Sequence, residues 1–586
     1  MKTNFFFFIL FLLLVFSGCI EQGHLKVNIV VQHVSSQPDG LHPFNNNSSV
    51  RSFIFNYTQK TLIKLDMESL EYIPVLIDSL PEISEDGLAY TYKIRKGIKW
   101  DDGTLFTSRD VAFSTKLMLC PLTDNTQIRS NYNTVIKSIQ TYPEDAYKFT
   151  MHAKKLHVSN KDIFSELYMQ QEQRWDQEGL LNNLSFEDIY NENWEASELI
   201  QDWFVQFNHA DNSYATNNLT GLGSYQVTEF KTGQYITLEK KKDWWGENDT
   251  LIYNISRPDK IIFRIITDDA AVYFALKNER IDATTYISTK KFLDLRNDDK
   301  FNQNYHSDFI DRFAFNYIGL NTKPDGINHK QFFIDKRVRR AMAYLTPVDK
   351  IIQVMVYGHA IRQTSNISPL KSSYNDTLKE IPLDIEKAKI LLDEAGWIDT
   401  DGDNIRDKII DGIKTPFTFN FSYMSSATST QVVLMIQESM KQAGVNAIPS
   451  PMDFSLFYER AQNHEFDAML GGWGGSASYS DPMQLWHTSS WVTKGSNFCG
   501  FGDAESDALI EEANTSIDPK KHKEALWKLQ AKIYEEQPYV FLYSSKNKIA
   551  IHKRFDNANM YRERPGVILN NLLLIDSRAQ IPTNGL

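Results

Sequence analysis

Three short motifs come close to those that carry catalysis, and each lacks a residue that the chemistry needs. His464-Glu465 begins like a zinc-binding HExxH helix, but no second histidine follows. Gly474 to Ser478 resembles a nucleophile elbow that ends in serine where glycine is required. Gly221-Leu222-Gly223 lacks the third glycine of a dinucleotide-binding loop. We therefore expect no enzyme and no cofactor. A secreted hydrolase is the enzymatic alternative, because spacing does not show which of the 74 acidic residues meet in space.

One acidic cluster has a spacing that suits a cation. Aspartates occupy positions 1, 3, 5 and 9 of a calcium-loop pattern, as Asp399, Asp401, Asp403 and Asp407. The pattern also requires glycine at position 6 and glutamate at position 12, where this chain has Asn404 and Ile410. Two interpretations follow. We expect a solvated acidic turn, and a calcium site is the weaker candidate.

The overall composition excludes several classes of protein. The 586 residues are too many for one ordinary domain and indicate two or three lobes. A formal net charge of −12, without a run of lysine or arginine, argues against nucleic-acid binding. Three cysteines are too few for a disulfide framework. Cys120 and Cys499 are expected as separately buried thiols, with a disulfide between them as the alternative.

The first residues have the features of an export signal. Lys2 precedes an unbroken apolar run from Phe5 to Phe16, which is too short to span a bilayer comfortably. Phe16-Ser17-Gly18-Cys19 follows and resembles a bacterial lipobox. We expect a signal peptide at 1–18 and a lipidated amino terminus at 19–23, with the lipid on Cys19. A plain secretory signal is the alternative. The rest of the chain is then expected in the cell envelope, outside the cytoplasm and held to a membrane by lipid.

Capping residues and apolar runs place several helices and strands. Helices are expected to start at the Thr107–Asp110 capping box, after Asp384, at Thr428 and at Asp518-Pro519. Short β-branched or aromatic runs predict strands at 90–94, 261–266 and 417–421. Because helices and strands alternate along most of the chain, the pattern favours α/β lobes.

One long segment, from Glu85 to Thr107, is distinctive. It has an Asp86-Gly87 turn, a strand, and glycines at 97 and 103 that interrupt the backbone. It resembles the signature of family 5 of the bacterial extracellular solute-binding proteins, the dipeptide- and oligopeptide-binding group. Further blocks resemble the same family, at 221–225 with 244–245, at 333–341, at 395–403 and at 472–482. The resemblance covers about residues 35 to 545.

The resemblance implies a two-lobed periplasmic-binding-protein (Venus-flytrap) α/β fold with an extra domain inserted in lobe one. Mapped onto this chain, lobe one would comprise 24–55, 200–305 and 543–586. The inserted domain would comprise 56–199 and lobe two 306–542. Relatives are usually monomers, so a monomer is expected.

The resemblance also implies a function. The chain would capture peptides or a related small solute between two closing lobes and deliver them to the permease of an ABC importer with its ATPase subunits. Two alternatives stay open. The ligand could be a sugar or another non-peptide solute, or the chain could be a receptor-like lipoprotein on the same fold.

In peptide-binding relatives an aspartate that follows the Gly-Trp pair binds the ligand's terminal ammonium. Ser478 stands at that position here, with Asp481 nearby, which leaves free-peptide recognition in question. Trp473 matches a tryptophan of the cleft wall, and a core tryptophan is the alternative. The other residues expected at the ligand, from this segment and from the amino-terminal loop, are Gly474, Gly475, Ser476, Tyr479, Gln37, Asp39 and Leu41.

Overall fold

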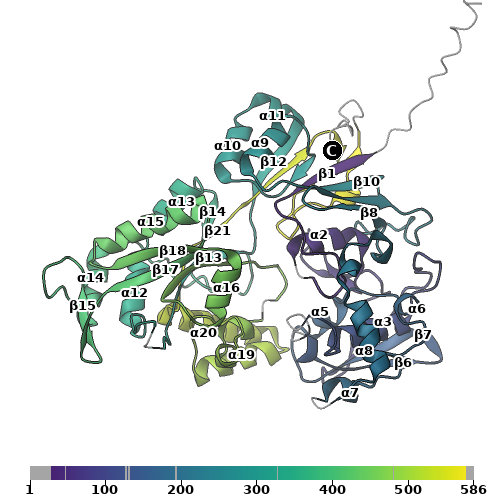
Figure 1. Cartoon of the computed structure of the whole chain (residues 1–586), viewed down its shortest axis with the longest axis horizontal. Coiled ribbons are helices and arrows are strands. Elements are labelled where there is room, and N and C mark those ends of the chain that lie inside the picture. The colour runs from purple at the N-terminus through teal and green to yellow at the C-terminus, as the bar shows by residue number, and fades with distance from the viewer. Residues whose placement is uncertain are drawn as a thin grey trace, which may run out of the picture.

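The computed structural model describes residues 28–575, except 47, 126–128, 130–131, 192–193, 326–327 and 480. The predicted signal peptide at 1–18 and the predicted lipid site at Cys19 lie outside the described residues. Three sheets of four or more strands organise the chain, and Figure 1 shows two separate bodies joined by a narrow connection. Among the described residues, no helix combines the length and apolar character that a bilayer crossing requires.

The largest sheet has seven strands, in the order β12-β22-β11-β1-β10-β9-β8. Their bounds are β1 Ile29–Val34, β8 Tyr225–Lys231, β9 Tyr235–Lys240, β10 Lys260–Ile265, β11 Ala283–Thr284, β12 Tyr305–Ile310 and β22 Asn547–His552. Alternate residues of β1 bury against opposite faces, as a strand requires. Val30 packs with Phe55 of α2 (Ser49–Thr58), and Val31 packs with Leu276 of α9 (Asp269–Lys277). This first lobe also carries α10 (Thr289–Arg296) and α11 (Asp299–Asn304).

A four-stranded antiparallel sheet lies below the first lobe in Figure 1. Its order is β4-β5-β7-β6, with bounds β4 Glu82–Ile83, β5 Ala89–Lys93, β7 Asp145–Ala153 and β6 Ile136–Tyr142. The capping box predicted at Thr107 and Asp110 is confirmed and starts α3 (Ser108–Leu119). Phe204 and Phe207 of α8 (Glu198–Phe207) are buried in the core of this unit.

The second lobe is built on five strands in the order β18-β17-β19-β13-β20. Their bounds are β13 Phe315–Leu320, β17 Thr418–Met424, β18 Asn446–Met452, β19 Ala468–Trp473 and β20 Tyr539–Phe541. One face packs on α12 (Lys336–Tyr344), α14 (Ile385–Glu394) and α15 (Ala427–Lys441). The other packs on α16 (Phe454–Gln462), α17 (Met483–Trp486), α19 (Ala504–Thr515) and α20 (Pro519–Glu536). The helices and strands predicted by capping and composition are confirmed to within two or three residues.

Two chain segments connect the lobes and lie side by side. One runs from β12 to β13, and the other runs from β21 (Tyr543–Ser545) to β22. Arg312 Nε donates to the carbonyl oxygen of Ser545 at 2.8 Å, and Ser544 Oγ donates to the carbonyl oxygen of Arg312 at 3.0 Å. A salt bridge of 3.0 Å joins Lys546 to Asp311. Two lobes joined by a paired hinge agree with the predicted fold class.

Candidate ligand-binding cleft

The first lobe and the loop before β24 (Leu573–Leu574) enclose a cavity of about 520 Å³. We call it the charged cavity, because five of its lining residues are acidic or basic: Lys60, Lys64, Glu166, Glu563 and Arg564. The second lobe contributes Ser476 to its lining. The cavity therefore faces the gap between the two lobes.

Burial shifts the ionisation of this cavity. Lys60 is almost fully buried, and burial lowers its pKa to about 7. Burial also lowers the pKa of Lys64 to about 8 and raises the pKa of Glu166. Many protein atoms lie around the Glu166 carboxylate, but its side chain still contacts solvent. This combination is expected for a side chain on the wall of an open cleft. Its Oε1 accepts a hydrogen bond from the Tyr72 hydroxyl at 2.9 Å.

The second lobe presents a larger cavity of about 770 Å³, within the range of small-ligand sites. We call it the aromatic cavity, for Phe313, Phe315, Trp473, Tyr479 and Trp486 in its lining. Trp473 ends β19, is half-buried, and donates from Nε1 to the Tyr539 hydroxyl at 3.3 Å. Its ring also stacks on Phe498, with ring centroids 5.7 Å apart. Trp473 thus both packs on the core and lines the cavity.

The two glycines after Trp473 allow close approaches that a side chain would prevent. A Cβ atom at Gly475 would lie 1.8 Å from the carbonyl oxygen of Phe313. A Cβ atom at Gly474 would lie 2.0 Å from Nη2 of Arg564. Both distances are far below van der Waals contact. Glycine at these positions lets the segment lie against the hinge on one side and the first lobe on the other.

The remaining candidates of this segment have partners within the protein. Lys371 Nζ donates to the carbonyl oxygen of Ser478 at 2.6 Å, and burial lowers the pKa of Lys371 to about 8. The Tyr479 hydroxyl donates to Asn514 Oδ1 at 2.6 Å. Ser478 and Tyr479 both line the aromatic cavity. A lysine ammonium thus lies beside Ser478 at the cavity wall.

Asp481 also lines the aromatic cavity, but its carboxylate contacts the other lobe. Oδ2 lies 3.3 Å from Nε2 of His157, and Oδ1 accepts from Asn514 Nδ2 at 2.8 Å and from the Met483 backbone N–H at 2.8 Å. Burial alone would raise the pKa of Asp481, but the bonds from His157, Met483 and Asn514 hold it below its ordinary value. Asp481 therefore joins the lobes at the mouth of the cleft.

The amino-terminal loop lies apart from these cavities. Gln37 Oε1 accepts from the backbone N–H of Gly233, in the β8–β9 turn, at 2.6 Å. The carbonyl oxygen of Asp39 accepts from the Tyr214 hydroxyl at 3.0 Å, and Leu41 is buried in the first lobe. None of Gln37, Asp39 and Leu41 lines the charged or the aromatic cavity. The structure brings 473–479 and Asp481 together and leaves these three aside.

Sequence reasoning missed the charged residues of the cleft. They come from four segments, each about 100 or more residues from the next in sequence: Lys60 and Lys64, Glu166, Lys371, and Glu563 and Arg564. No motif links the four segments, so no motif signal was available to find them. Their common feature is the position of their backbone on the two walls of the cleft.

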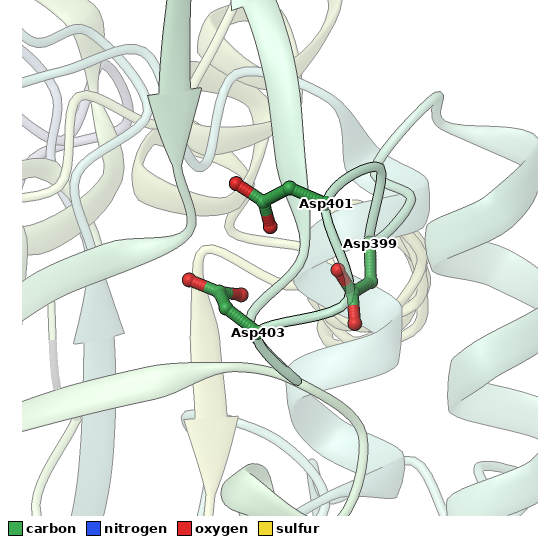
Figure 2. A group of neighbouring side chains, drawn as sticks. All are labelled: Asp399, Asp401 and Asp403. Carbon is green, nitrogen blue, oxygen red and sulfur yellow. The ribbon is translucent and has the colours of Figure 1, made fainter.

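Figure 2 shows three of the four aspartates of the acidic loop grouped around one exposed turn. Oxygens of Asp399, Asp401 and Asp403 lie within 4.8 Å of one another. Lys414 Nζ lies 2.7 Å from Asp401 Oδ2 and 3.3 Å from Asp407 Oδ2, and both oxygens of Asp399 accept backbone N–H groups. The Lys414 ammonium and backbone N–H groups thus already bind some of the carboxylate oxygens of this loop.

Comparison with known proteins defines the class. The family model of the bacterial extracellular solute-binding proteins, family 5, matches residues 71–496. The chain therefore belongs to this family of binding proteins, in agreement with the resemblance noted in its motifs.

Particular relatives support this assignment. The oligopeptide-binding protein AppA of Bacillus subtilis is 26% identical over 528 residues, which cover 88% of this chain and 86% of AppA. The heme-binding protein A of Haemophilus influenzae is 25% identical, over 82% of this chain and 80% of that protein. The structure of Bacillus subtilis AppA in complex with a nonapeptide matches with a TM-score of 0.73 at 25% identity, over 94% of this chain and 99% of that one.

Proposed function

We propose that this chain captures peptides between its two lobes and delivers them to the permease of an ABC importer, whose ATPase subunits drive uptake. The observation that carries the proposal is the pair of cavities between the lobes, one on each side of the glycine-rich segment after Trp473. The similarity to an oligopeptide-binding protein over most of both chains supports it. Capture requires no bond breaking, so no catalytic role is assigned to any residue.

Closure of the lobes is the proposed mechanism. A ligand that contacts both lobes favours the closed state by its differential affinity for the closed over the open state. Closure about the hinge at Arg312 and Ser545 removes water from the cleft, which strengthens polar contacts to the ligand. The permease would then recognise the closed arrangement of the two lobes.

Membrane attachment is part of the proposal. The lipobox-like sequence before Cys19 supports lipidation there, which would hold a monomeric binding protein at the outer side of a membrane. A mass increase on a peptide that begins at Cys19, in protein extracted from membranes, would establish it. A mature protein without that mass would reject it.

A non-peptide or amino-blocked ligand is the second candidate. The Lys371 ammonium lies 2.6 Å from the carbonyl oxygen of Ser478, where peptide-binding relatives hold an aspartate for the ligand's ammonium. Like charges repel in such a buried site, which favours a ligand whose end at this position is neutral or anionic.

Thermal unfolding of the mature protein, purified in detergent, would test both candidates. The ligands are free peptides, N-acetylated peptides, oligosaccharides and hemin. A ligand at about 100 times its Kd adds about 2.7 kcal/mol to stability. Stabilisation by either kind of peptide supports the proposal, and the N-acetylated form should stabilise more. Stabilisation by sugars or hemin alone would reject peptide capture.

A further inference from the structure

One side chain of the first lobe crosses the cleft to the backbone of the second. Glu563 lies between β23 (Phe555–Asp556) and β24, and its Oε2 accepts from the Ala477 backbone N–H at 2.7 Å. Glu563 is only 8% exposed. The neighbouring Arg564 reaches the same segment, since its guanidinium occupies the space that a side chain at Gly474 would need. The segment 474–477 is thus held against the opposite lobe.

The loop that carries Glu563 is firmly part of the first lobe. Tyr561 and Ile568 are buried with Met67 and Tyr253. The Leu569 backbone N–H donates to the Tyr57 hydroxyl at 3.3 Å. The contact between Glu563 and Ala477 therefore joins the first lobe to the second.

This contact also lies between the two cavities. Ser476, Glu563 and Arg564 line the charged cavity, whereas Gly475 and Ala477 line the aromatic cavity. Because consecutive residues of one segment line different cavities, the segment forms the wall between them. Glu563 and Arg564 fasten that wall to the first lobe.

We propose that Glu563 sets the length of ligand that the cleft accepts, an inference that rests on the proposed peptide capture. A short peptide fits within one cavity and leaves the wall intact. A long peptide must span both cavities and take the Ala477 N–H from the Glu563 carboxylate. That bond is charge-assisted, and such bonds are roughly twice as strong as neutral ones. The freed carboxylate would remain among charged neighbours of both signs, Glu166, Lys64 and Lys371.

Isothermal titration calorimetry on the mature protein in detergent would test this role. The probes are a tripeptide and a nonapeptide of one repeating sequence, each with a free and with an acetylated amino terminus. In the Glu563→Ala variant, the affinity for the nonapeptide relative to the tripeptide should rise by about tenfold. Glu563→Gln keeps an oxygen that accepts from Ala477 but loses the charge. Its ratio of nonapeptide to tripeptide affinity should therefore lie between those of Glu563→Ala and the wild type.

His157→Ala is the matched control. His157 Nε2 contacts Asp481 across the same gap, at 3.3 Å, but lines neither cavity. Its removal should weaken closure and lower the affinity for both peptides by the same factor. If the Glu563 contact only held the lobes closed, Glu563→Ala would likewise lower both affinities by one factor. The ratio of the two affinities therefore separates a role in lobe closure from a role in selecting ligand length.

An unchanged ratio in Glu563→Ala would overturn the inference while leaving peptide capture intact. If Glu563→Ala does not fold, as judged by circular dichroism, the ratio of Glu563→Gln decides: a ratio above that of the wild type supports the role, and a wild-type ratio rejects it. A wild-type protein that binds none of the four peptides would reject the proposed function and this inference together.

Discussion

At the residue scale, burial changes the protonation of the Lys60 side chain. Its Nζ donates to the carbonyl oxygen of Tyr253 at 2.5 Å and lies 5.9 Å from the ring centroid of Trp244. These contacts do not replace the lost hydration, since the pKa of Lys60 falls to about 7. The charged form is therefore less stable in the folded protein than in the unfolded chain.

The stability of the protein should depend on pH through this lysine. In the unfolded chain lysine has a pKa near 10.5, so between about pH 7 and 10.5 the unfolded chain binds more protons than the folded one. The free energy of unfolding should therefore rise with pH across this window. Lys60→Met should reduce the rise, leaving the part due to Lys64 and Lys371, and its free energy of unfolding should exceed that of the wild type at pH 7 by roughly 4 kcal/mol.

Urea denaturation at pH 7 and pH 10 would measure both values. Lys99→Met, at an exposed lysine, is the control and should keep the wild-type dependence on pH. A Lys60→Met protein whose stability rises with pH as much as that of the wild type would contradict the assignment.

At the scale of elements, the central strand of the first lobe depends on one buried ion pair. Asp282 Oδ2 accepts from the Val31 backbone N–H of β1 at 2.8 Å. It also lies 2.7 Å from Nη2 of Arg554, which follows β22, and both side chains are almost inaccessible to solvent. The pair thus joins β1, the residue before β11 and the segment between β22 and β23, which are far apart in sequence.

Asp282→Asn should therefore lower the free energy of unfolding by about 3 kcal/mol, because it leaves the buried Arg554 without the charge of Asp282. Asp308→Asn makes the same change at an exposed pair with Arg296 and should cost less than about 1 kcal/mol. Chemical denaturation of the two variants would compare them. Equal losses would show that burial does not govern the contribution of the Asp282 pair.

At the scale of the whole molecule, the hinge determines how the lobes move. Arg312 binds both the carbonyl oxygen and the hydroxyl of Ser545, at 2.8 and 2.7 Å, and so couples the two connections. Burial lowers the pKa of Arg312, so its hydrogen bonds form in a region of low hydration. Loss of this side chain should let the two connections bend independently.

Arg312→Ala should weaken the binding of the peptide identified by the screen by roughly tenfold, because a looser hinge must be ordered when the lobes close. Its radius of gyration without ligand, from small-angle X-ray scattering, should exceed that of the wild type. Arg337→Ala, at an exposed pair with Asp335, is the control and should leave both quantities unchanged. Wild-type affinity in Arg312→Ala would refute the role of the hinge contact.

Local sequence patterns were enough to predict the main helices and strands and the family. The capping box at Thr107, the cap at Asp384 and the strand around Phe419 act within a few residues, so local patterns predicted them. The segment 85–107 indicated the family, which the family model confirmed. Trp473 was placed at the cleft because it lies in a recognisable block of sequence, and it lines the aromatic cavity.

The composition of the cleft, in contrast, follows from the packing of the folded lobes. Lys60 and Glu563 are about 500 residues apart in sequence yet line one cavity. Asp481, expected at the ligand, binds His157 of the other body, and the loop at Gln37 lies aside. The elements and the cleft differ in the distance along the chain over which the interactions act. Caps and periodicity depend on neighbours a few residues away, whereas a cleft between two lobes depends on hinge geometry and on side chains that meet only after both lobes have folded.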